Sequence, residues 1–244
     1  LVGEKPRLIV LNRADQADPV LNKAWGKWFR DRGCAVLETD SKTGKGVDQF
    51  SNVAKEALKE QIARWREKGQ VGRPVRVMVV GVPNVGKSTF INKVAKRKSA
   101  KAQDRPGVTR GKQWVAVDAG LDLLDTPGIL WPKFEDQEVG RRLAYTGAIK
   151  DDIMDVEELG CTLMEELAAR YPQALTDRYK LIPEPGIPGW ELLEAAGRKR
   201  GFLISGGEVD LNRMARVLLD EFRGGKLGRF TLEMPEGVGV DGTD

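Results

Sequence analysis

Hydrophobic and polar positions follow one another in blocks that predict short strands separated by helices. Leu8–Leu11, Ala35–Leu37 and Val75–Val80 are mostly apolar runs of strand length, and each leads into a polar or Gly-containing loop. Trp114–Val117 and Leu121–Leu124 bracket an Asp-Ala-Gly turn and predict a hairpin. Strands that alternate with helices are typical of a mostly parallel α/β sheet.

Helical periodicity accounts for most of the remaining chain. From Val47 to about Lys68, apolar residues recur every three or four positions, which predicts one long helix. Further helices are expected at residues 19–32, 88–98, 156–171, 190–199 and 211–223.

Strand patterns stop after about Lys150, which suggests a change of domain. We therefore expect an α/β domain over residues 1–153 and a smaller, all-helical C-terminal domain over residues 154–233. Residues 234–244 are rich in glycine and are expected to form a flexible tail.

Composition limits the class of protein. The chain has 244 residues, of which 41% are hydrophobic, enough for a buried core and too many for a disordered chain. Its apolar runs fall far short of the ~20 residues that a membrane span needs, so no membrane partner is expected. Charge is uneven: residues 1–153 carry 29 basic and 19 acidic residues, whereas residues 154–244 carry 11 and 17. The first part can therefore attract a polyanion.

Histidine and cysteine counts exclude further classes of site. The chain has no histidine, which excludes histidine-ligated metals, Ser-His-Asp triads and histidine general bases within it. Two cysteines cannot form a disulfide framework, so a reducing cytoplasm is the expected location.

A phosphate-binding motif lies between the strand at Val75–Val80 and the helix that follows. Gly81–Ser88 fits the pattern G-x-x-x-x-G-K-[ST], in which backbone N–H groups surround phosphate oxygens at a helix N-terminus. Lys87 would place a positive charge near the β- and γ-phosphates, and the Ser88 hydroxyl would bind Mg²⁺. The predicted phosphate-binding residues are Pro83, Asn84, Val85, Gly86, Lys87, Ser88 and Thr89.

Two further segments predict contacts to Mg²⁺ and the γ-phosphate. Asp125 ends an apolar strand and would hold Mg²⁺ through water, and Gly128 would bring its N–H to the γ-phosphate. Alone, the D-T-P-G sequence is equally well a simple turn. Thr109, in a loop rich in Lys and Arg, would complete the Mg²⁺ shell when GTP is bound, although a plain turn is the alternative.

Candidate base-binding residues follow the first two strands. A carboxylate such as Asp15 can accept hydrogen bonds from guanine N1–H and its 2-amino group, a pair that adenine lacks. Asn12 would tie this loop to the phosphate loop, and Ser41-Lys42 would offer a backbone N–H to the guanine oxygen. Such loops are weak signals alone, but each follows a strand, where α/β sheets place their ligands.

The order of these segments is informative, because base-binding loops follow the phosphate loop in Ras-like GTPases and precede it here. This predicts a circularly permuted P-loop GTPase domain. The sequence resembles the circularly permuted ribosome biogenesis GTPase A (YlqF/RbgA) family. The matching segments are Leu11–Asp15, Gly81–Ser88, Pro106–Thr109, Leu123–Asp136, Thr146–Lys150 and Arg200–Gly207.

The resemblance implies a cytoplasmic GTPase that assists maturation of the large (50S) ribosomal subunit. It implies GTP and GDP as ligands, Mg²⁺ as cofactor, and rRNA bound by the surface and the helical C-terminal domain, but not DNA. Hydrolysis would be slow alone and stimulated by the subunit. A guanine-nucleotide-dependent RNA-binding module with little hydrolysis is the alternative, and a small-subunit permuted GTPase is a weaker one.

The resemblance also suggests roles for individual residues. Lys87, Thr109 and Gly128 are the expected catalytic residues, and Ile129 replaces the water-orienting glutamine of other GTPases. Asn84 matches a K⁺ ligand of potassium-dependent relatives. Arg13 departs from the usual lysine, but its aliphatic stem can still pack over the base, which preserves guanine binding.

One expectation concerns the start of the chain. The resembling family carries a segment ahead of the position of Leu1, with a histidine implicated in hydrolysis and a strand central to the sheet. We expect this sequence to begin within a longer protein and its sheet to lack an interior strand.

Basic clusters are candidate RNA contacts. Residues 93–112 include eight Lys or Arg and one acidic residue, next to the Thr109 loop. Arg198–Arg200 would contact phosphate or complement a helix C-terminus. Trp131 and Phe134 are candidate partner anchors, whereas Trp114 is expected to pack in the sheet.

Overall fold

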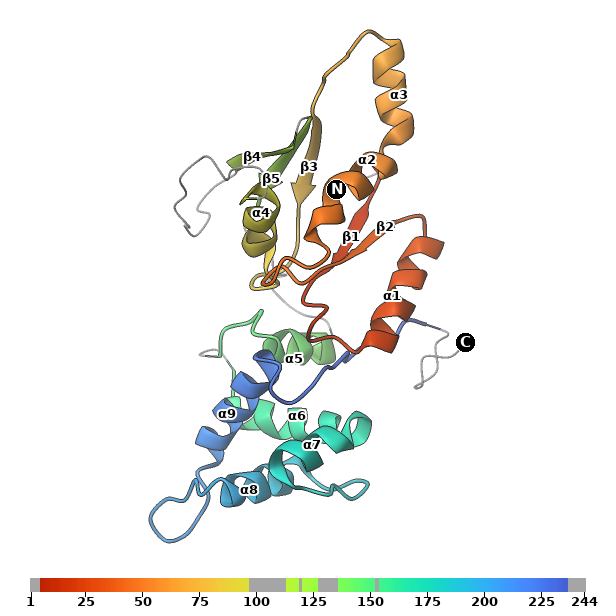
Figure 1. The fold of residues 1–244 in the computed structure, drawn as a ribbon. Helices are drawn as coiled ribbons and strands as arrows, with labels where there is room; N and C mark the ends of the chain where they lie inside the picture. The colour runs from red at the N-terminus through yellow and green to blue at the C-terminus, as the bar shows by residue number, and fades with distance from the viewer. Residues whose placement is uncertain (1–4, 97–112, 119, 127–135, 152–153, 237–244) are drawn as a thin grey trace. The chain divides into compact units, whose positions relative to one another are not determined.

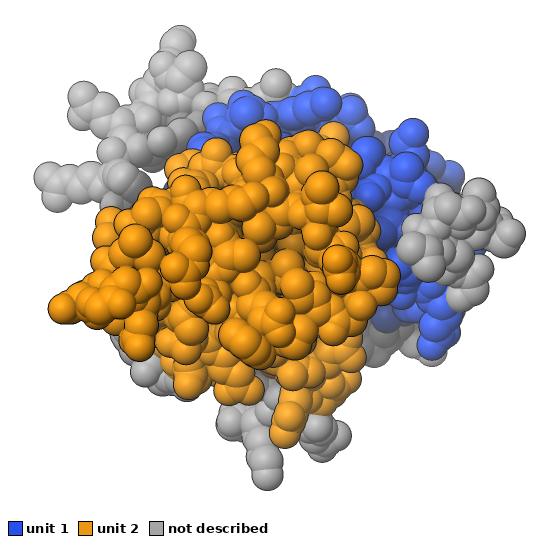
Figure 2. Space-filling view, turned by 90° about the horizontal axis from the view of Figure 1, so that it is seen from below, with its two compact units in different colours: residues 1–130, 233–244 blue, residues 131–232 orange. Residues whose placement is uncertain are grey.

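The chain forms two compact units in a computed structural model, which describes residues 5–96, 113–118, 120–126, 136–151 and 154–236 (Figure 1). Unit 1 comprises residues 1–130 and 233–244, and unit 2 comprises residues 131–232; Figure 2 colours them separately. The domain boundary expected near residue 153 lies inside unit 2, because the helix before it packs with the helices after it.

Unit 1 contains the predicted alternation of strands and helices. Its described elements are β1 (Leu8–Leu11), α1 (Pro19–Asp31), β2 (Ala35–Glu38), the 3-10 helix η1 (Val47–Gln49), α2 (Phe50–Ala57), α3 (Lys59–Glu67), β3 (Val75–Val79), α4 (Lys87–Lys96), β4 (Gln113–Asp118) and β5 (Leu121–Asp125). β1 pairs in parallel with β2, and β5 pairs in parallel with β3. The predicted hairpin is confirmed, because β4 runs antiparallel to β5.

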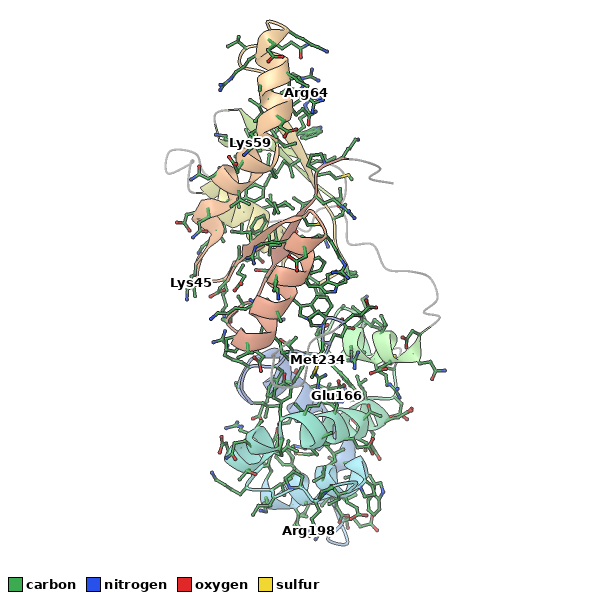
Figure 3. All side chains as sticks on the ribbon, turned by 90° about the vertical axis from the view of Figure 1, so that its right-hand side faces the viewer. Lys45, Lys59, Arg64, Glu166, Arg198 and Met234 are labelled. Carbon is green, nitrogen blue, oxygen red and sulfur yellow. The ribbon has the colours of Figure 1, made fainter. Side chains whose placement is uncertain are left out.

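The single helix expected from Val47 to about Lys68 is wrong. Leu58, with φ −113° and ψ 10°, separates α2 from α3. α2 buries Phe50 and Ala54 in the core, whereas α3 has no buried residue and packs Ile62 and Trp65 only partly buried against it. Figure 3 labels Lys59 and Arg64 along α3.

The strands of unit 1 form two separate sheets, β1-β2 and β3-β5-β4. Among the described residues, no strand pairs with the outer edge of β1 or of β3. A groove of about 860 Å³ lies there, with Leu8, Val10, Val77 and Trp65 among its lining side chains.

The core of unit 1 joins the two sheets through helices. Leu37 of β2, Phe50 of α2, Ile91 of α4 and Leu123 of β5 belong to one buried cluster. The rings of Phe50 and Phe90 meet edge to face, with centroids 5.2 Å apart. α4 therefore packs against both the β3-β5-β4 sheet and the start of α2.

The regular elements described in unit 2 are helices, apart from an isolated bridge between Leu203 and Val209. Its helices are α5 (Gln137–Tyr145), α6 (Val156–Arg170), α7 (Pro172–Tyr179), α8 (Gly189–Lys199) and α9 (Leu211–Arg223). α6 packs against each of the other four. Gly160 allows α9 to approach closely, since a Cβ there would lie 2.6 Å from Cβ of Ala215. The sequence analysis predicted α6, α8 and α9 but not α5 or α7.

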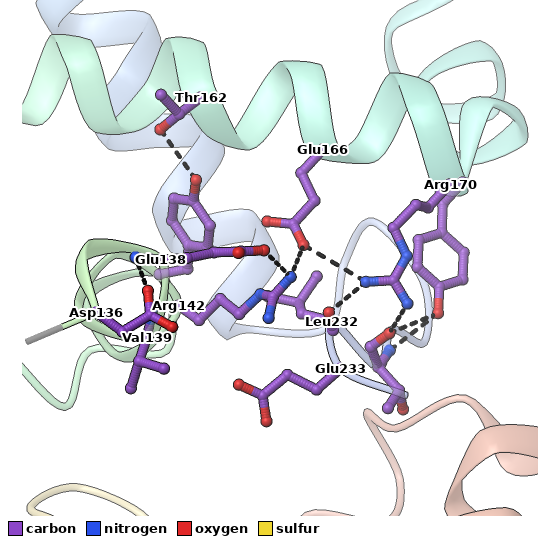
Figure 4. Close-up of polar contacts among 12 residues, drawn as sticks. Asp136, Glu138, Val139, Arg142, Thr162, Glu166, Arg170, Leu232 and Glu233 are labelled. Atoms are coloured by element: carbon purple, nitrogen blue, oxygen red, sulfur yellow. Dashed lines mark hydrogen bonds and ion pairs between the residues drawn. The ribbon is translucent and has the colours of Figure 1, made fainter. Parts of the chain in front are cut away.

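Polar contacts also join the elements of unit 2 (Figure 4). Arg142 of α5 pairs with Glu138 and, at 3.4 Å, with Glu166 of α6. Arg170 lies 3.5 Å from the same carboxylate and donates to the carbonyl of Thr231 at 3.0 Å. Among the described residues, none of the helices combines the length and the apolar character that crossing a membrane requires.

Candidate nucleotide-binding site

The predicted phosphate loop connects β3 to α4, as its motif requires. Asn84 (φ 60°) and Gly86 (φ 92°) adopt left-handed conformations that turn the backbone. A Cβ on Gly86 would lie 2.5 Å from Asn12 Nδ2, so a side chain there would displace Asn12. The Phe90 amide donates to the Gly86 carbonyl at 2.8 Å, which continues the first turn of α4.

Lys87 lies across this loop. Its ammonium group donates to the carbonyls of Gly81 at 2.9 Å and Val82 at 2.7 Å. Ser88 and Thr89 are exposed in the first turn of α4, where the helix dipole favours an anion. The loop therefore combines a held cation, a helix N-terminus and accessible hydroxyl groups.

Asp125 ends β5 beside the start of the phosphate loop. The parallel register pairs Val79 with Asp125, and the Thr126 hydroxyl donates to the Val79 carbonyl at 2.5 Å. Hydroxyl and carboxylate oxygens such as those of Ser88 and Asp125 suit Mg²⁺. Four predicted residues, Thr109, Gly128, Ile129 and Trp131, lie outside the described residues, as does Phe134.

Asn12 connects the first base-binding loop to the phosphate loop. Its Nδ2 donates to the Val85 carbonyl at 2.8 Å. Its Oδ1 accepts bonds from the Thr39 hydroxyl at 3.1 Å, the Ser41 hydroxyl at 2.7 Å and the Ser41 amide at 3.2 Å. One side chain thus holds the ends of β1 and β2 against the phosphate loop, and the contact predicted from the sequence is present.

The turn after Asn12 presents Asp15 to solvent. Arg13 adopts a left-handed conformation (φ 57°), and the Ala14 amide donates to the Thr39 carbonyl at 3.0 Å. Both features fix the turn, and Asp15 is exposed at its tip. The carboxylate is accessible to a ligand beside the phosphate loop.

Asp40 organises the second base-binding loop and was not predicted from the sequence. Its side chain accepts bonds from the Lys42 amide at 2.9 Å and the Thr43 amide at 3.2 Å, and from the Thr43 hydroxyl. Burial would raise the pKa of Asp40, but these hydrogen bonds outweigh it and lower the pKa. An Asp followed by Ser-Lys-Thr-Gly is a turn pattern that could have revealed this role.

The backbone amides of Ser41 and Lys42 take part in bonds that hold this loop. The Ser41 amide donates to Asn12 and the Lys42 amide donates to Asp40. Both predicted donors to the guanine oxygen are therefore already engaged in the loop as it stands. Lys45, labelled in Figure 3, closes the loop, because its carbonyl accepts a hydrogen bond from the Asp40 amide at 3.0 Å.

Comparison with known proteins agrees with this site. The profile of a family described as "50S ribosome-binding GTPase" matches residues 76–173. Ribosome biogenesis GTPase A of Bacillus cereus is 45% identical over 241 residues, which cover 98% of this chain and 80% of the relative. The chain belongs to the ribosome biogenesis GTPase A family. The resemblance inferred from the motifs is thereby confirmed, and as a member of this family the chain is a GTP-hydrolysing enzyme.

More distant relatives and solved structures agree with that assignment. Ribosome biogenesis GTPase A of Thermotoga maritima is 30% identical over 97% of this chain. The GDP-bound structure of TM YlqF has a TM-score of 0.67 at 29% identity, covering 96% of this chain and 86% of that one. The GNP-bound structure of YlqF from T. maritima has a TM-score of 0.60. The α/β P-loop GTPase fold of unit 1 is therefore established.

Proposed function

We propose that this GTPase is an assembly factor for the large ribosomal subunit that binds pre-ribosomal RNA in a nucleotide-dependent way and acts in the cytoplasm. The observation that carries the proposal is the Asn12 side chain, which joins the base-binding loops to the phosphate loop. Such a connection supports the proposal that a purine-binding turn and a phosphate cradle belong to one site. The match to the 50S ribosome-binding GTPase family supports the ribosomal partner.

A circularly permuted domain explains how these loops meet. The base-binding loops at residues 12–15 and 41–42 precede the phosphate loop at 81–88, the reverse of Ras-like order. Parallel strands place their carboxyl ends at one edge of a sheet, whatever the order in which the chain visits them. Because β1 and β2 form one sheet and β3 belongs to another, it is the hydrogen bonds of Asn12 that support one site made by the loops after all three strands.

Base selection would depend on Asp15. Its exposed carboxylate would accept hydrogen bonds from guanine N1–H and the 2-amino group, whereas adenine offers no such pair of donors. The aliphatic stem of Arg13 would pack over the ring. Ser41 and Lys42 would shape the far side of the base pocket.

Hydrolysis would depend on charge placed around the phosphates. Lys87 would exchange its bonds to Gly81 and Val82 for bonds to phosphate oxygens, where its charge stabilises the transition state. Ser88, Asp125 and Thr109 would hold Mg²⁺, which neutralises phosphate charge when bound. Asn84 would take a K⁺ ion, and the Thr109 and Gly128 segments would respond to the γ-phosphate.

The proposed RNA contacts lie in both units. The basic run at residues 93–112 would meet phosphate near the nucleotide-responsive segments. In unit 2, Arg200 pairs with Glu221 and Arg198 with Glu194, while Lys199 donates to the Lys180 carbonyl. Arg200 is half-buried against the buried Glu221, which favours a structural role, whereas Arg198 and Lys199 are exposed and stay the candidate phosphate contacts.

Single-turnover phosphate release tests the proposal. The full chain would be mixed with GTP in K⁺ and Mg²⁺ buffer, with and without large ribosomal subunits. We expect release above background that rises when subunits are added. No change with subunits would contradict the assembly role, and binding of GTP and RNA without release would support the alternative of an RNA-binding module.

A further inference from the structure

The base-binding loop at residues 40–46 is attached to α4 by a side chain that no motif marks. The Lys93 ammonium group donates to the Lys42 carbonyl at 3.2 Å. Lys93 lies in α4, whose first residue is Lys87 of the phosphate loop. The bond therefore connects the phosphate-loop helix to the peptide that follows Ser41-Lys42.

The shape of the loop is consistent with this contact. A Cβ on Gly44 would lie 2.7 Å from Cε of Lys93, so the lysine stem passes directly over Gly44. Gly44 also has φ +96°, a conformation that side chains rarely adopt, and its amide donates to the Asp40 carbonyl at 2.7 Å. A glycine at this position leaves room both for the turn and for the lysine.

Two side chains thus attach this loop to the phosphate-binding element from different sides. Asn12 holds Ser41 and the Val85 carbonyl, and Lys93 holds the Lys42 carbonyl. Asp40 shapes the loop from within. Without Lys93, the loop keeps its internal bonds and the packing of η1 on α4 but loses this hydrogen bond to the helix.

We infer that Lys93 is a positioning residue for guanine: it fixes residues 41–45 relative to the phosphate loop and so raises affinity for the base without touching the phosphates. The inference rests on the proposed guanine-nucleotide site. It gives α4, whose N-terminus belongs to the phosphate loop, a second role in base recognition. A lost hydrogen bond from a charged donor at a partly exposed position predicts an effect of about three- to tenfold.

The test compares Lys93→Met with Lys93→Arg and with Lys23→Met, which makes the same change on α1. Competition against fluorescent GDP in Mg²⁺ buffer would give affinities for GDP and for inorganic pyrophosphate, which occupies only the phosphate loop. We expect Lys93→Met to weaken GDP about three- to tenfold and to leave pyrophosphate unchanged. Lys93→Arg should restore most of the GDP affinity, and Lys23→Met should behave as wild type.

Hydrogen–deuterium exchange of the nucleotide-free chain separates this inference from the proposed function. Lys93→Met should speed exchange in peptides covering residues 41–46 and leave α4 unchanged. Unaltered GDP affinity, or an equal loss of GDP and pyrophosphate, would overturn the inference. If the wild-type chain binds no GDP, the proposed function is wrong, and so is the role of Lys93 in guanine binding. Hydrogen–deuterium exchange would then report only whether Lys93 holds residues 41–46.

Discussion

The two units of this molecule stabilise their structure in different ways. Of the largest fully buried side chains among the described residues, four lie in unit 1 (Phe50, Ile91, Leu121 and Leu123) and eight lie in unit 2. Unit 1 keeps an apolar groove of about 860 Å³ beside its phosphate loop, whereas α6 of unit 2 is surrounded by helices.

The buried carboxylate of Glu221 in unit 2 has hydrogen-bond partners on both oxygens. Glu221 is only 5% exposed and accepts hydrogen bonds from Arg178 at 3.0 Å, Tyr179 at 2.8 Å and Arg200 at 3.0 Å. In unit 1 the polar groups of the candidate site are instead directed at loops. In unit 1 the polar groups of the candidate nucleotide site therefore lie on turns, whereas in unit 2 the polar groups hold helices together.

The largest effect is expected from a substitution in the phosphate loop of unit 1, and it should leave unit 2 unchanged. Lys87→Met should lower GTP hydrolysis by at least about 100-fold, because a positioned charge next to the transferred phosphate is lost. Circular dichroism and hydrogen exchange of unit 2 should stay unchanged. Lys23→Met, a matched loss of charge on α1, is the control, and hydrolysis of Lys87→Met near the wild-type rate would contradict the assigned site.

The next effect should appear only in unit 2. Glu221→Gln breaks a buried carboxylate cluster and should lower the free energy of unfolding of unit 2 by about 3 kcal/mol. Hydrogen exchange of α6 and α9 would report this loss, while GDP affinity stays at the wild-type value. Glu194→Gln removes an exposed partner of Arg198 and should cost less than about 0.5 kcal/mol.

A smaller effect is expected on the choice of base, with the fold unchanged. Asp15→Asn should weaken GDP binding about 10- to 100-fold, since the charged acceptor of two guanine donors is lost. Xanthine carries a carbonyl where guanine carries the 2-amino group, so XDP should bind this variant better than it binds wild type. Competition titrations would measure both. GDP affinity that survives the substitution would mean that another residue selects the base.

Lowering the pH should decrease the stability of unit 2 by protonating Glu221. This is the smallest of the predicted effects. Burial would raise its pKa, but the bonds from Arg178, Tyr179 and Arg200 outweigh it and lower the pKa to about 2. The carboxylate is therefore stabilising above its unfolded pKa of about 4.5, and this contribution disappears as pH falls toward 2. The difference in unfolding free energy between wild type and Glu221→Gln should shrink over that range; a constant difference would contradict the low pKa.

Much of unit 1 could be predicted from the sequence because its signals are local. The strand at Leu8–Leu11, the hairpin and the P-loop context each depend on neighbouring residues, and the structure contains all three. The prediction of one long helix failed at Leu58 because the apolar periodicity continues through Leu58 and Ile62, which pack against the same core, and so gives no sign of the break. Asp40 and Lys93 were missed because their partners are set by the three-dimensional path of a loop.

Unit 2 was harder to predict for a different physical reason. Its amphipathic pattern revealed three helices but could not reveal that Glu221 of α9 gathers Arg178 and Tyr179 from α7 and Arg200 from the end of α8. Such a cluster has no spacing signature, since its members are distant in sequence. The same limitation placed Arg200 among the RNA-contact candidates, although it is bonded inside the unit.

The central claim is that unit 1 binds guanine nucleotides through Asp15 and the phosphate loop. Titration of the full chain with fluorescent GDP in Mg²⁺ buffer, with unlabelled GTP and ATP as competitors, tests it most directly. The account predicts saturable binding that GTP displaces and ATP does not. Displacement by ATP as readily as by GTP, or no binding by a chain whose circular dichroism shows it to be folded, would contradict it.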